Sequence, residues 1–141
     1  MAKQFRGRID LDIRDSEPDW EPYLAPKAPH GAPNVLYIAW DDLGFATMDC
    51  YGGPVECPNT ARIAEMGVQF SNFHTTALCS PTRACLLTGR NHHSAGFGVI
   101  SEQSTGFPGY NSIINKDKAT IGRILLDNGY STSWFGKDHN T

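Results

Sequence analysis

A cysteine and an arginine, Cys79 and Arg83, have the types and the spacing of an anion-binding site. Cys79 lies at the start of a predicted helix, where the helix dipole and the free backbone N–H groups favour negative charge. Arg83 follows about one helical turn later, so its guanidinium can reach the same helix end. The pair indicates an anion site beside a potential nucleophile, although Cys79 alone would suit an ordinary buried thiol.

Two further polar clusters follow apolar segments. Asp41 and Asp42 end the run 35–40, and adjacent carboxylates in such a place repel each other. A hard divalent cation would relieve that repulsion, because Ca²⁺ and Mg²⁺ take oxygen ligands; a solvated turn is the alternative. Lys137 and His139 come after the run 130–135, where a polar loop is likewise the alternative.

The pattern of apolar residues predicts the elements that hold these clusters. Strands are predicted at 35–40, 68–73 and 130–135. Helices are predicted at 58–66, 82–88 and 120–128, with glycine stops at Gly67, Gly89 and Gly129. Asn59 or Thr60 is the expected cap of the first helix, and residues 91–118 are expected to be mostly loop.

The order strand, helix, strand predicts an α/β layer with parallel neighbours. In such sheets the reactive groups lie just beyond the carboxyl ends of the strands. Asp41-Asp42 and Lys137/His139 both occupy such positions. We therefore expect the two clusters to face one rim of the sheet.

Residues 1–33 differ from the rest of the chain. Proline recurs every three or four residues from Pro18 to Pro33, which forbids a regular helix and disfavours a central strand. We expect an extended arm, with Trp20 and Tyr23 packed onto the body of the protein. The predicted organisation is a proline-rich extension, 1–33, followed by a domain at 34–141.

Composition narrows the class of protein. The chain is 40% hydrophobic, which favours a packed core, and its net charge of −3 includes no block that would indicate nucleic acid. No apolar stretch has bilayer length, and residues 1–10 are polar and lack the apolar core of a signal peptide, which predicts a cytoplasmic protein without membrane contact. Without export, neither a disulfide framework nor a zinc site is expected, and Cys50, Cys57 and Cys85 are interpreted as buried thiols.

The segment around Cys79 resembles the signature of an enzyme family. Cys79-Ser80-Pro81-Thr82-Arg83, followed by Leu86-Leu87-Thr88-Gly89-Arg90, is similar to the sulfatase signature. The bacterial arylsulfatase branch is resembled along nearly the whole chain, through Asn34-Val35-Leu36 before Asp41-Asp42, Phe73-His74-Thr75-Thr76-Ala77, and Gly136-Lys137-Asp138-His139. The resemblance implies an α/β fold like that of alkaline phosphatase. This is a sandwich with a largely parallel central sheet flanked by helices, and the chain would be its N-terminal part.

The resemblance also implies a maturation step and a reaction. In the family a formylglycine-generating enzyme oxidises the signature cysteine, here Cys79, to Cα-formylglycine, whose hydrate carries two hydroxyls. One hydroxyl attacks the sulfur of a sulfate ester, and the other, once deprotonated, expels sulfate and restores the aldehyde. Pro81 and Arg83 resemble the elements that the maturation enzyme reads. The implied activity is a sulfuric ester hydrolase of the arylsulfatase type, acting on a sulfate-ester small molecule.

Site roles follow from the same resemblance. Arg83 matches the residue that stabilises the hydrated aldehyde, and Lys137 matches a sulfate-binding lysine. His139 matches the histidine that hydrogen-bonds the formylglycine hydroxyl and acts as the base in sulfate elimination. The implied catalytic residues are Cys79, Arg83, Lys137 and His139, with Lys137 and His139 also binding substrate. The implied metal ligands, normally for Ca²⁺ with Mg²⁺ as the alternative, are Asp41, Asp42 and modified Cys79.

Four nearby residues have weaker signals. His74 precedes the signature and His92-His93 follows it in a loop, so we interpret these histidines as structural or rim residues. Asp138 stands where many relatives carry Trp or Asn, and we expect it to alter the local surface or the substrate pocket.

The resemblance requires more residues than the chain supplies. A later Asp/Asn metal pair, a second histidine and a second lysine are not placed before Thr141, so we expect an N-terminal fragment without turnover of its own. Two alternatives stay open: a phosphodiester or phosphonate hydrolase of the same superfamily, and a catalytically silent fragment or regulatory module. The sequence does not identify the sulfate ester, although the arylsulfatase branch favours aryl sulfates.

Overall fold

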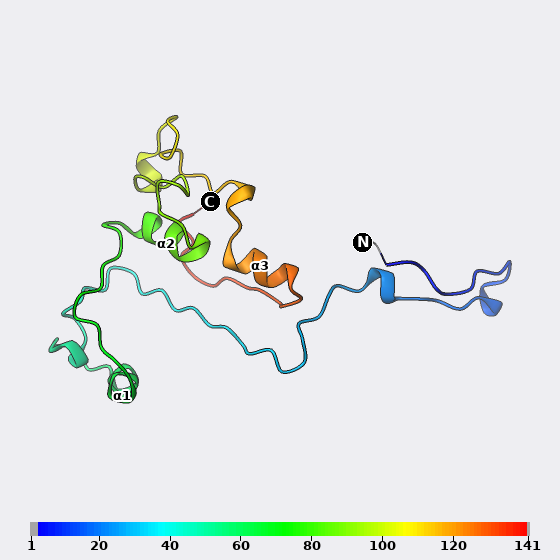
Figure 1. The fold of residues 1–141 in the computed structure, drawn as a ribbon, viewed down its shortest axis with the longest axis horizontal. Coiled ribbons are helices and arrows are strands. Elements are labelled where there is room, and N and C mark those ends of the chain that lie inside the picture. The colour runs from blue at the N-terminus through cyan, green and yellow to red at the C-terminus, as the bar shows by residue number, and fades with distance from the viewer. Residues whose placement is uncertain (1–2, 141) are drawn as a thin grey trace. The chain divides into compact units, whose positions relative to one another are not determined.

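The computed structural model describes residues 3–140. Within them the regular structure is helical: α1 (Pro58–Met66), α2 (Cys79–Thr88) and α3 (Ile121–Asp127) (Figure 1). The other described residues include short 3-10 helices: η1 (Ile13–Asp15), η2 (Glu21–Tyr23), η3 (Asp49–Tyr51), η4 (Ser101–Gln103) and η5 (Lys116–Lys118). No described helix is long and apolar enough to cross a membrane. The cytoplasmic location stays a prediction.

All three predicted helices are confirmed; α1 has the predicted bounds, while α2 and α3 have shifted ends. The helix α2 begins at Cys79 rather than Thr82, because Pro81 falls in the first turn, where the backbone N–H that proline lacks would have no helical partner. It ends at Gly89, whose φ of 64° is the left-handed conformation expected of a stop. The predicted side-chain cap of α1 by Asn59 or Thr60 is wrong, since Cys57 occupies the N-cap position and makes no side-chain cap bond.

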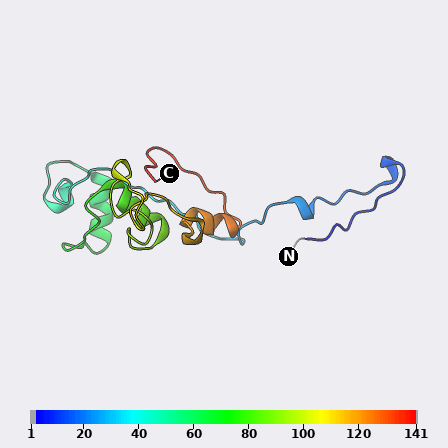
Figure 2. The same ribbon diagram turned by 90° about the horizontal axis from the view of Figure 1, so that it is seen from above.

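The predicted sheet is not formed within residues 3–140, and neither view of the ribbon contains a strand arrow (Figures 1 and 2). Segments 35–40, 68–73 and 131–135 make no backbone–backbone hydrogen bond with other described residues. Their apolar side chains remain exposed, with Leu36 at 81% and Phe135 at 90%. A strand needs a neighbour to pair its N–H and C=O groups, so an apolar run without one stays irregular. The described residues therefore contain the predicted helices but not the predicted parallel sheet.

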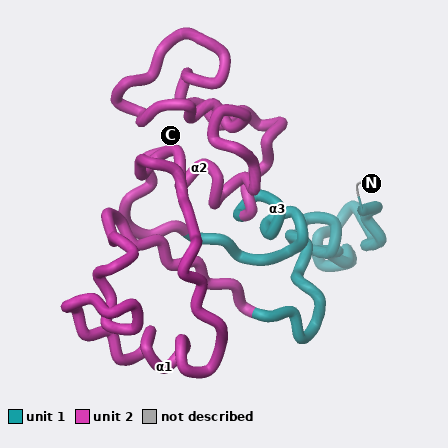
Figure 3. The backbone as a smooth tube through the Cα atoms, turned by 60° about the vertical axis from the view of Figure 1, so that its left-hand side comes forward, with its two compact units in different colours: residues 1–33, 122–133 teal, residues 34–121, 134–141 magenta. Residues whose placement is uncertain are grey.

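The chain divides into two compact units, which are coloured separately in Figure 3. One contains the residues up to Pro33 together with Gly122–Ser133, and the other contains Asn34–Ile121 and the residues from Trp134 onward. The predicted domain boundaries, 1–33 and 34–141, stay a prediction.

In the first unit, a short antiparallel contact joins Arg8 and Glu17, whose backbones exchange hydrogen bonds of 2.9 and 2.8 Å. After α3, Gly129 adopts a φ of 85° and its carbonyl accepts the N–H of Ala28 at 2.9 Å. A Cβ at Gly129 would lie 2.3 Å from the Lys27 carbonyl carbon, so the close approach requires glycine. Trp20 and Tyr23 are exposed within this unit, and their packing onto the body of the protein stays a prediction.

The core of the second unit is small and lies against α2. Ala84 of that helix is fully buried with Ala95 and Phe97, and Ile114 packs against them. Residues 91–118 are mostly loop, as predicted, but backbone hydrogen bonds order them: the Phe97 N–H donates to the His92 carbonyl at 2.7 Å. Ala95 and Phe97 of this ordered loop pack against Ala84 of α2, and η4, which belongs to the same loop, contacts the start of the helix through Ser101 and Ser80.

Candidate active site

The first turn of α2 is the base of the site. Leu78 has an extended backbone, and its carbonyl accepts the Thr82 N–H at 3.1 Å, which closes the turn. Cys79 is the first helical residue and its free thiol is half-buried. Ser80 and Arg83 are buried beneath it. The sequence prediction that Cys79 stands at a helix N-terminus with Arg83 one turn on is confirmed.

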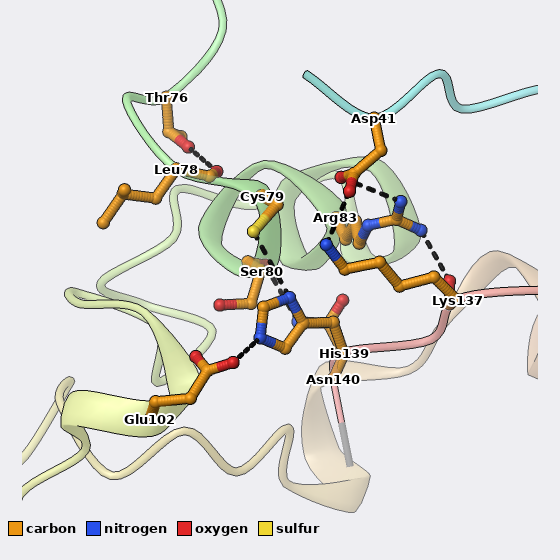
Figure 4. A network of polar contacts seen from close by, with 10 residues as sticks. All are labelled: Asp41, Thr76, Leu78, Cys79, Ser80, Arg83, Glu102, Lys137, His139 and Asn140. Atoms are coloured by element: carbon orange, nitrogen blue, oxygen red, sulfur yellow. Dashed lines mark hydrogen bonds and ion pairs between the residues drawn. The ribbon is translucent and has the colours of Figure 1, made fainter.

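Arg83 links two segments that are far from it in sequence (Figure 4). Its side chain is only 8% exposed, and its Nη1 donates to the backbone carbonyl of Lys137 at 2.6 Å. Its Nη2 donates to Oδ1 of Asp41 at 3.2 Å. The buried guanidinium thus has a carbonyl and a carboxylate as partners, as a buried cation requires.

Lys137 completes this cluster of charges. Its Nζ lies 2.6 Å from Oδ2 of Asp41, so each carboxylate oxygen faces one cation. The hydrogen bond from Lys137, assisted by Arg83, holds the pKa of Asp41 below its ordinary value, against a smaller opposing effect of desolvation. The same bond raises the pKa of Lys137. Asp41 is therefore an ionised carboxylate paired with two cations.

His139 lies between a thiol and a carboxylate (Figure 4). Its Nδ1 is 3.3 Å from Sγ of Cys79, and its Nε2 is 2.5 Å from Oε1 of Glu102. Its side chain is largely buried and its φ of 62° is unusual for a residue with a side chain. The pKa of Glu102 is lowered, first by a hydrogen bond from its own backbone N–H and then by His139.

The turn η4 connects the His139 segment with α2. The Ser101 N–H donates to Oγ of Ser80 at 3.0 Å, and the Ser101 hydroxyl donates to the carbonyl of His139 at 2.9 Å. From the other side, Nδ2 of the buried Asn140 donates to the Ser80 carbonyl at 2.8 Å. Ser80 is thereby bonded both to η4, through Ser101, and to the segment that follows His139, through Asn140.

The structure does not assemble the predicted metal ligands. Asp41 is paired with Lys137 and Arg83, while Asp42 is exposed, has a φ of 55° and lies outside this network. Among residues 3–140, no group of three or more His, Cys, Asp or Glu side chains is placed to hold a metal ion. The metal roles of Asp41, Asp42 and Cys79 stay predictions.

The other histidines have local partners. Nε2 of His74 lies 2.7 Å from Oδ1 of Asn72, and Nδ1 of His92 lies 2.8 Å from the Phe97 carbonyl. His92 also stacks on His93, with ring centroids 4.1 Å apart. These contacts agree with the structural interpretation of the three histidines. Asp138, between the two site residues Lys137 and His139, is exposed.

Comparison of the sequence with known proteins identifies its family. The sulfatase family model matches residues 33–141. The chain belongs to the sulfatase family. It is 40% identical over 114 residues to an uncharacterized sulfatase of Schizosaccharomyces pombe, a match that covers 76% of this chain and 21% of the relative.

Two further sulfatases show the same partial coverage. An arylsulfatase of Klebsiella aerogenes is 33% identical over 109 residues, covering 76% of this chain and 24% of the relative. Human arylsulfatase A is 36% identical over 111 residues, covering 76% and 21%. The chain thus spans between a fifth and a quarter of the length of these relatives. Family membership implies the alkaline-phosphatase-like fold, of which the described residues contain helices and no sheet.

The structure brings five of the six predicted site residues of this chain into one network of polar contacts, namely Asp41, Cys79, Arg83, Lys137 and His139 (Figure 4). Sequence reasoning missed Ser101, Glu102 and Asn140, which contact that network. Ser101 and Glu102 belong to a stretch predicted to be loop, where no periodic pattern of apolar residues indicates which side chains face inward. No signal in the sequence around these residues could have identified them.

Proposed function

We propose that the natural protein containing this sequence is a sulfuric ester hydrolase of the arylsulfatase type, with residue 79 as its reacting position. The convergence of Arg83, Lys137 and His139 on the first turn of α2 carries this proposal. Two cations and a helix N-terminus favour a bound anion such as a sulfate ester. His139, with Nδ1 3.3 Å from Sγ of Cys79, is placed to accept a proton from the group on residue 79.

The oxidised form of Cys79 fits this position. The thiol is free and half-buried at the start of α2, so the group on residue 79 stays accessible to a substrate after folding. As Cα-formylglycine, residue 79 would supply an aldehyde hydrate as the nucleophile toward the sulfur of the ester. Ser80, Pro81 and Arg83 are buried once α2 has packed. The formylglycine-generating enzyme is therefore expected to read this segment before the helix is formed.

Lys137 is the proposed sulfate-binding cation. Its side chain is 44% exposed, in contrast to Arg83, and its ammonium can turn from Asp41 toward an incoming oxyanion. Arg83 stays fixed by its bond to the Lys137 carbonyl and keeps the lysine segment against α2.

A divalent cation, Ca²⁺ or Mg²⁺, is not accommodated by the described residues alone. Ca²⁺ takes about six to eight oxygen ligands, whereas Asp41 is occupied by two cationic side chains and Asp42 lies apart. These two aspartates would contribute carboxylate oxygens to such an ion together with ligands from outside residues 3–140. We assign the ion no step in the reaction.

Aryl sulfates are the first substrates to test, because two of the three relatives described above are named arylsulfatases. The natural full-length protein is co-produced with a formylglycine-generating enzyme and assayed with an aryl sulfate and an aryl phosphodiester. We expect turnover of the sulfate that is abolished by Cys79→Ala and retained by Cys57→Ala, a change at the half-buried cysteine before α1.

Mass spectrometry of the peptide containing Cys79 tests the modification separately. Replacement of sulfur by oxygen with loss of two hydrogen atoms is the expected result. Preferential turnover of the phosphodiester would support the phosphohydrolase alternative. An unmodified thiol together with no turnover would support a catalytically silent protein, and either outcome would refute the proposed function.

A further inference from the structure

The carboxylate of Glu102 stands behind His139, on the side of the ring opposite Cys79. The distance from Oε1 of Glu102 to Nε2 is 2.5 Å, and the distance from Nδ1 to Sγ of Cys79 is 3.3 Å. The imidazole therefore spans a carboxylate and the reacting residue (Figure 4). Neither the signature nor the family resemblance points to Glu102.

This geometry determines which ring nitrogen of His139 carries the proton. A neutral imidazole has one N–H donor and one lone-pair acceptor, and an ionised carboxylate only accepts hydrogen bonds. The pKa of Glu102 is lowered, chiefly by a hydrogen bond from its own backbone N–H, so the side chain is a carboxylate near neutral pH. The proton therefore lies on Nε2, and the lone pair of Nδ1 faces residue 79.

The backbone of His139 is held by the same turn that carries Glu102. A φ of 62° is costly for a residue with a side chain, so surrounding contacts must maintain it. The Ser101 hydroxyl donates to the His139 carbonyl, and the Ser101 N–H donates to Oγ of Ser80. Two consecutive residues of η4 thus fix the ring, the backbone and the adjacent turn of α2. The bonds from Ser101 to the His139 carbonyl and from the His139 ring to Glu102 therefore hold a residue whose backbone conformation is costly.

We propose that Glu102 is a positioning residue for His139, an inference that rests on the proposed function. By accepting Nε2–H it keeps Nδ1 unprotonated and directed at residue 79. When the group on residue 79 gives up its proton, the bond to that hydrogen breaks, an N–H bond forms at Nδ1, and the electron pair stays on residue 79. The resulting imidazolium then lies against the Glu102 carboxylate, which stabilises its charge.

Kinetics of the natural full-length protein test this role. Glu102→Ala is expected to lower kcat by about 10- to 100-fold, the usual effect of removing the carboxylate partner of a functional histidine, with KM unchanged. Glu102→Asp keeps a carboxylate and should retain more activity than Glu102→Ala. Because the Glu102 side chain is 64% exposed, thermal unfolding of both variants should match the wild type. Glu65→Ala, at an exposed position of α1, is the matched control.

A double-mutant cycle separates this role from a general structural one. If Glu102 acts through His139, adding Glu102→Ala to His139→Ala should have almost no further effect on kcat. Additive losses in the double variant would overturn the proposal. Equal activities of Glu102→Ala and wild type would also overturn it.

The tautomer is measured directly by ¹⁵N spectra of histidine-labelled protein, with the His139 signals identified by their loss in His139→Ala. We expect a protonated Nε2 and an unprotonated Nδ1 in the neutral ring, and a mixture of tautomers in Glu102→Ala. A wild-type ring protonated on Nδ1 would overturn the proposal. This readout needs no turnover, so it tests the role of Glu102 even if the protein hydrolyses no sulfate ester.

Discussion

Removing the charge of Arg83 should release the segment that carries Lys137 and His139. The Arg83 guanidinium donates to the Lys137 carbonyl at 2.6 Å from a side chain that is nearly buried, so salt screens this bond little. Arg83→Met keeps an apolar stem in the same space and removes both hydrogen bonds. While the segment is closed, Asp41 keeps its ion pair with Lys137 in this variant, so the closed state contains no unpaired carboxylate at Asp41.

The expected magnitude follows from the bond to the Lys137 carbonyl. Loss of a hydrogen bond to a charged group costs about 1.5–3 kcal/mol. If that bond restrains local opening, the open population of the segment rises by about 10- to 150-fold, since each 1.4 kcal/mol is a factor of ten. Proteolytic cleavage tracks that population when closing is faster than cutting.

The assay is cleavage after Lys137 by a lysine-specific protease, followed by mass spectrometry of the natural full-length protein. Cleavage after Lys27, which belongs to the other compact unit, is an internal control and should not change. Arg62→Met, at an exposed position of α1, is the control variant. Cleavage after Lys137 that stays within about twofold of wild type in Arg83→Met, well below the 10-fold minimum, would refute the reasoning.

Two further predictions concern Asp41 and Lys137. Because the pKa of Asp41 is lowered in the fold, its stabilising contribution is complete above its ordinary value of 3.8 and is lost as the pH falls through the lower folded value. Asp41→Asn should therefore lower the melting temperature near neutral pH but not in strong acid, and an equal loss at both would contradict the ion pair. Lys137→Ala should raise KM for an aryl sulfate by about 10-fold or more, as expected for the loss of one charge-assisted bond, while Lys116→Ala should leave KM unchanged. Steady-state kinetics measure both values, and an unchanged KM in Lys137→Ala would contradict a sulfate-binding role.

The local part of the site could be predicted from the sequence. Cys79, Pro81 and Gly89 specify where a helix can begin and end, and the spacing from Cys79 to Arg83 then places both side chains on one helical face. These signals involve residues within one element. Gly89 and Gly129, with φ of 64° and 85°, are informative for the same reason, because a left-handed residue favours the end of a helix. Gly67 follows α1 with a φ of −141°, so it ends that helix without the left-handed conformation.

Contacts between distant segments could not be predicted in this way. Glu102 is separated from His139 by 37 residues, and nothing in its immediate sequence distinguishes it from a solvated loop carboxylate. The predicted strands failed for a related reason. An apolar run such as 35–40 indicates that its side chains favour burial, but a strand forms only when another segment supplies hydrogen bonds.

The polar site is formed without the sheet that was expected to position it. Lys137 reaches Asp41 across 96 residues, Arg83 reaches the Lys137 carbonyl across 54, and His139 reaches Cys79 across 60. Each contact ends on α2 or on a residue bonded to α2, and Ser101 of η4 bonds both Ser80 and His139. The start of α2 therefore organises this candidate site. Its buried Arg83 bonds Asp41 and the Lys137 carbonyl, and its buried Ser80 bonds Ser101 and Asn140. A substitution that breaks the first turn of α2 should disperse all of these contacts together, whereas one in 35–40 should leave those around Cys79 and His139 in place.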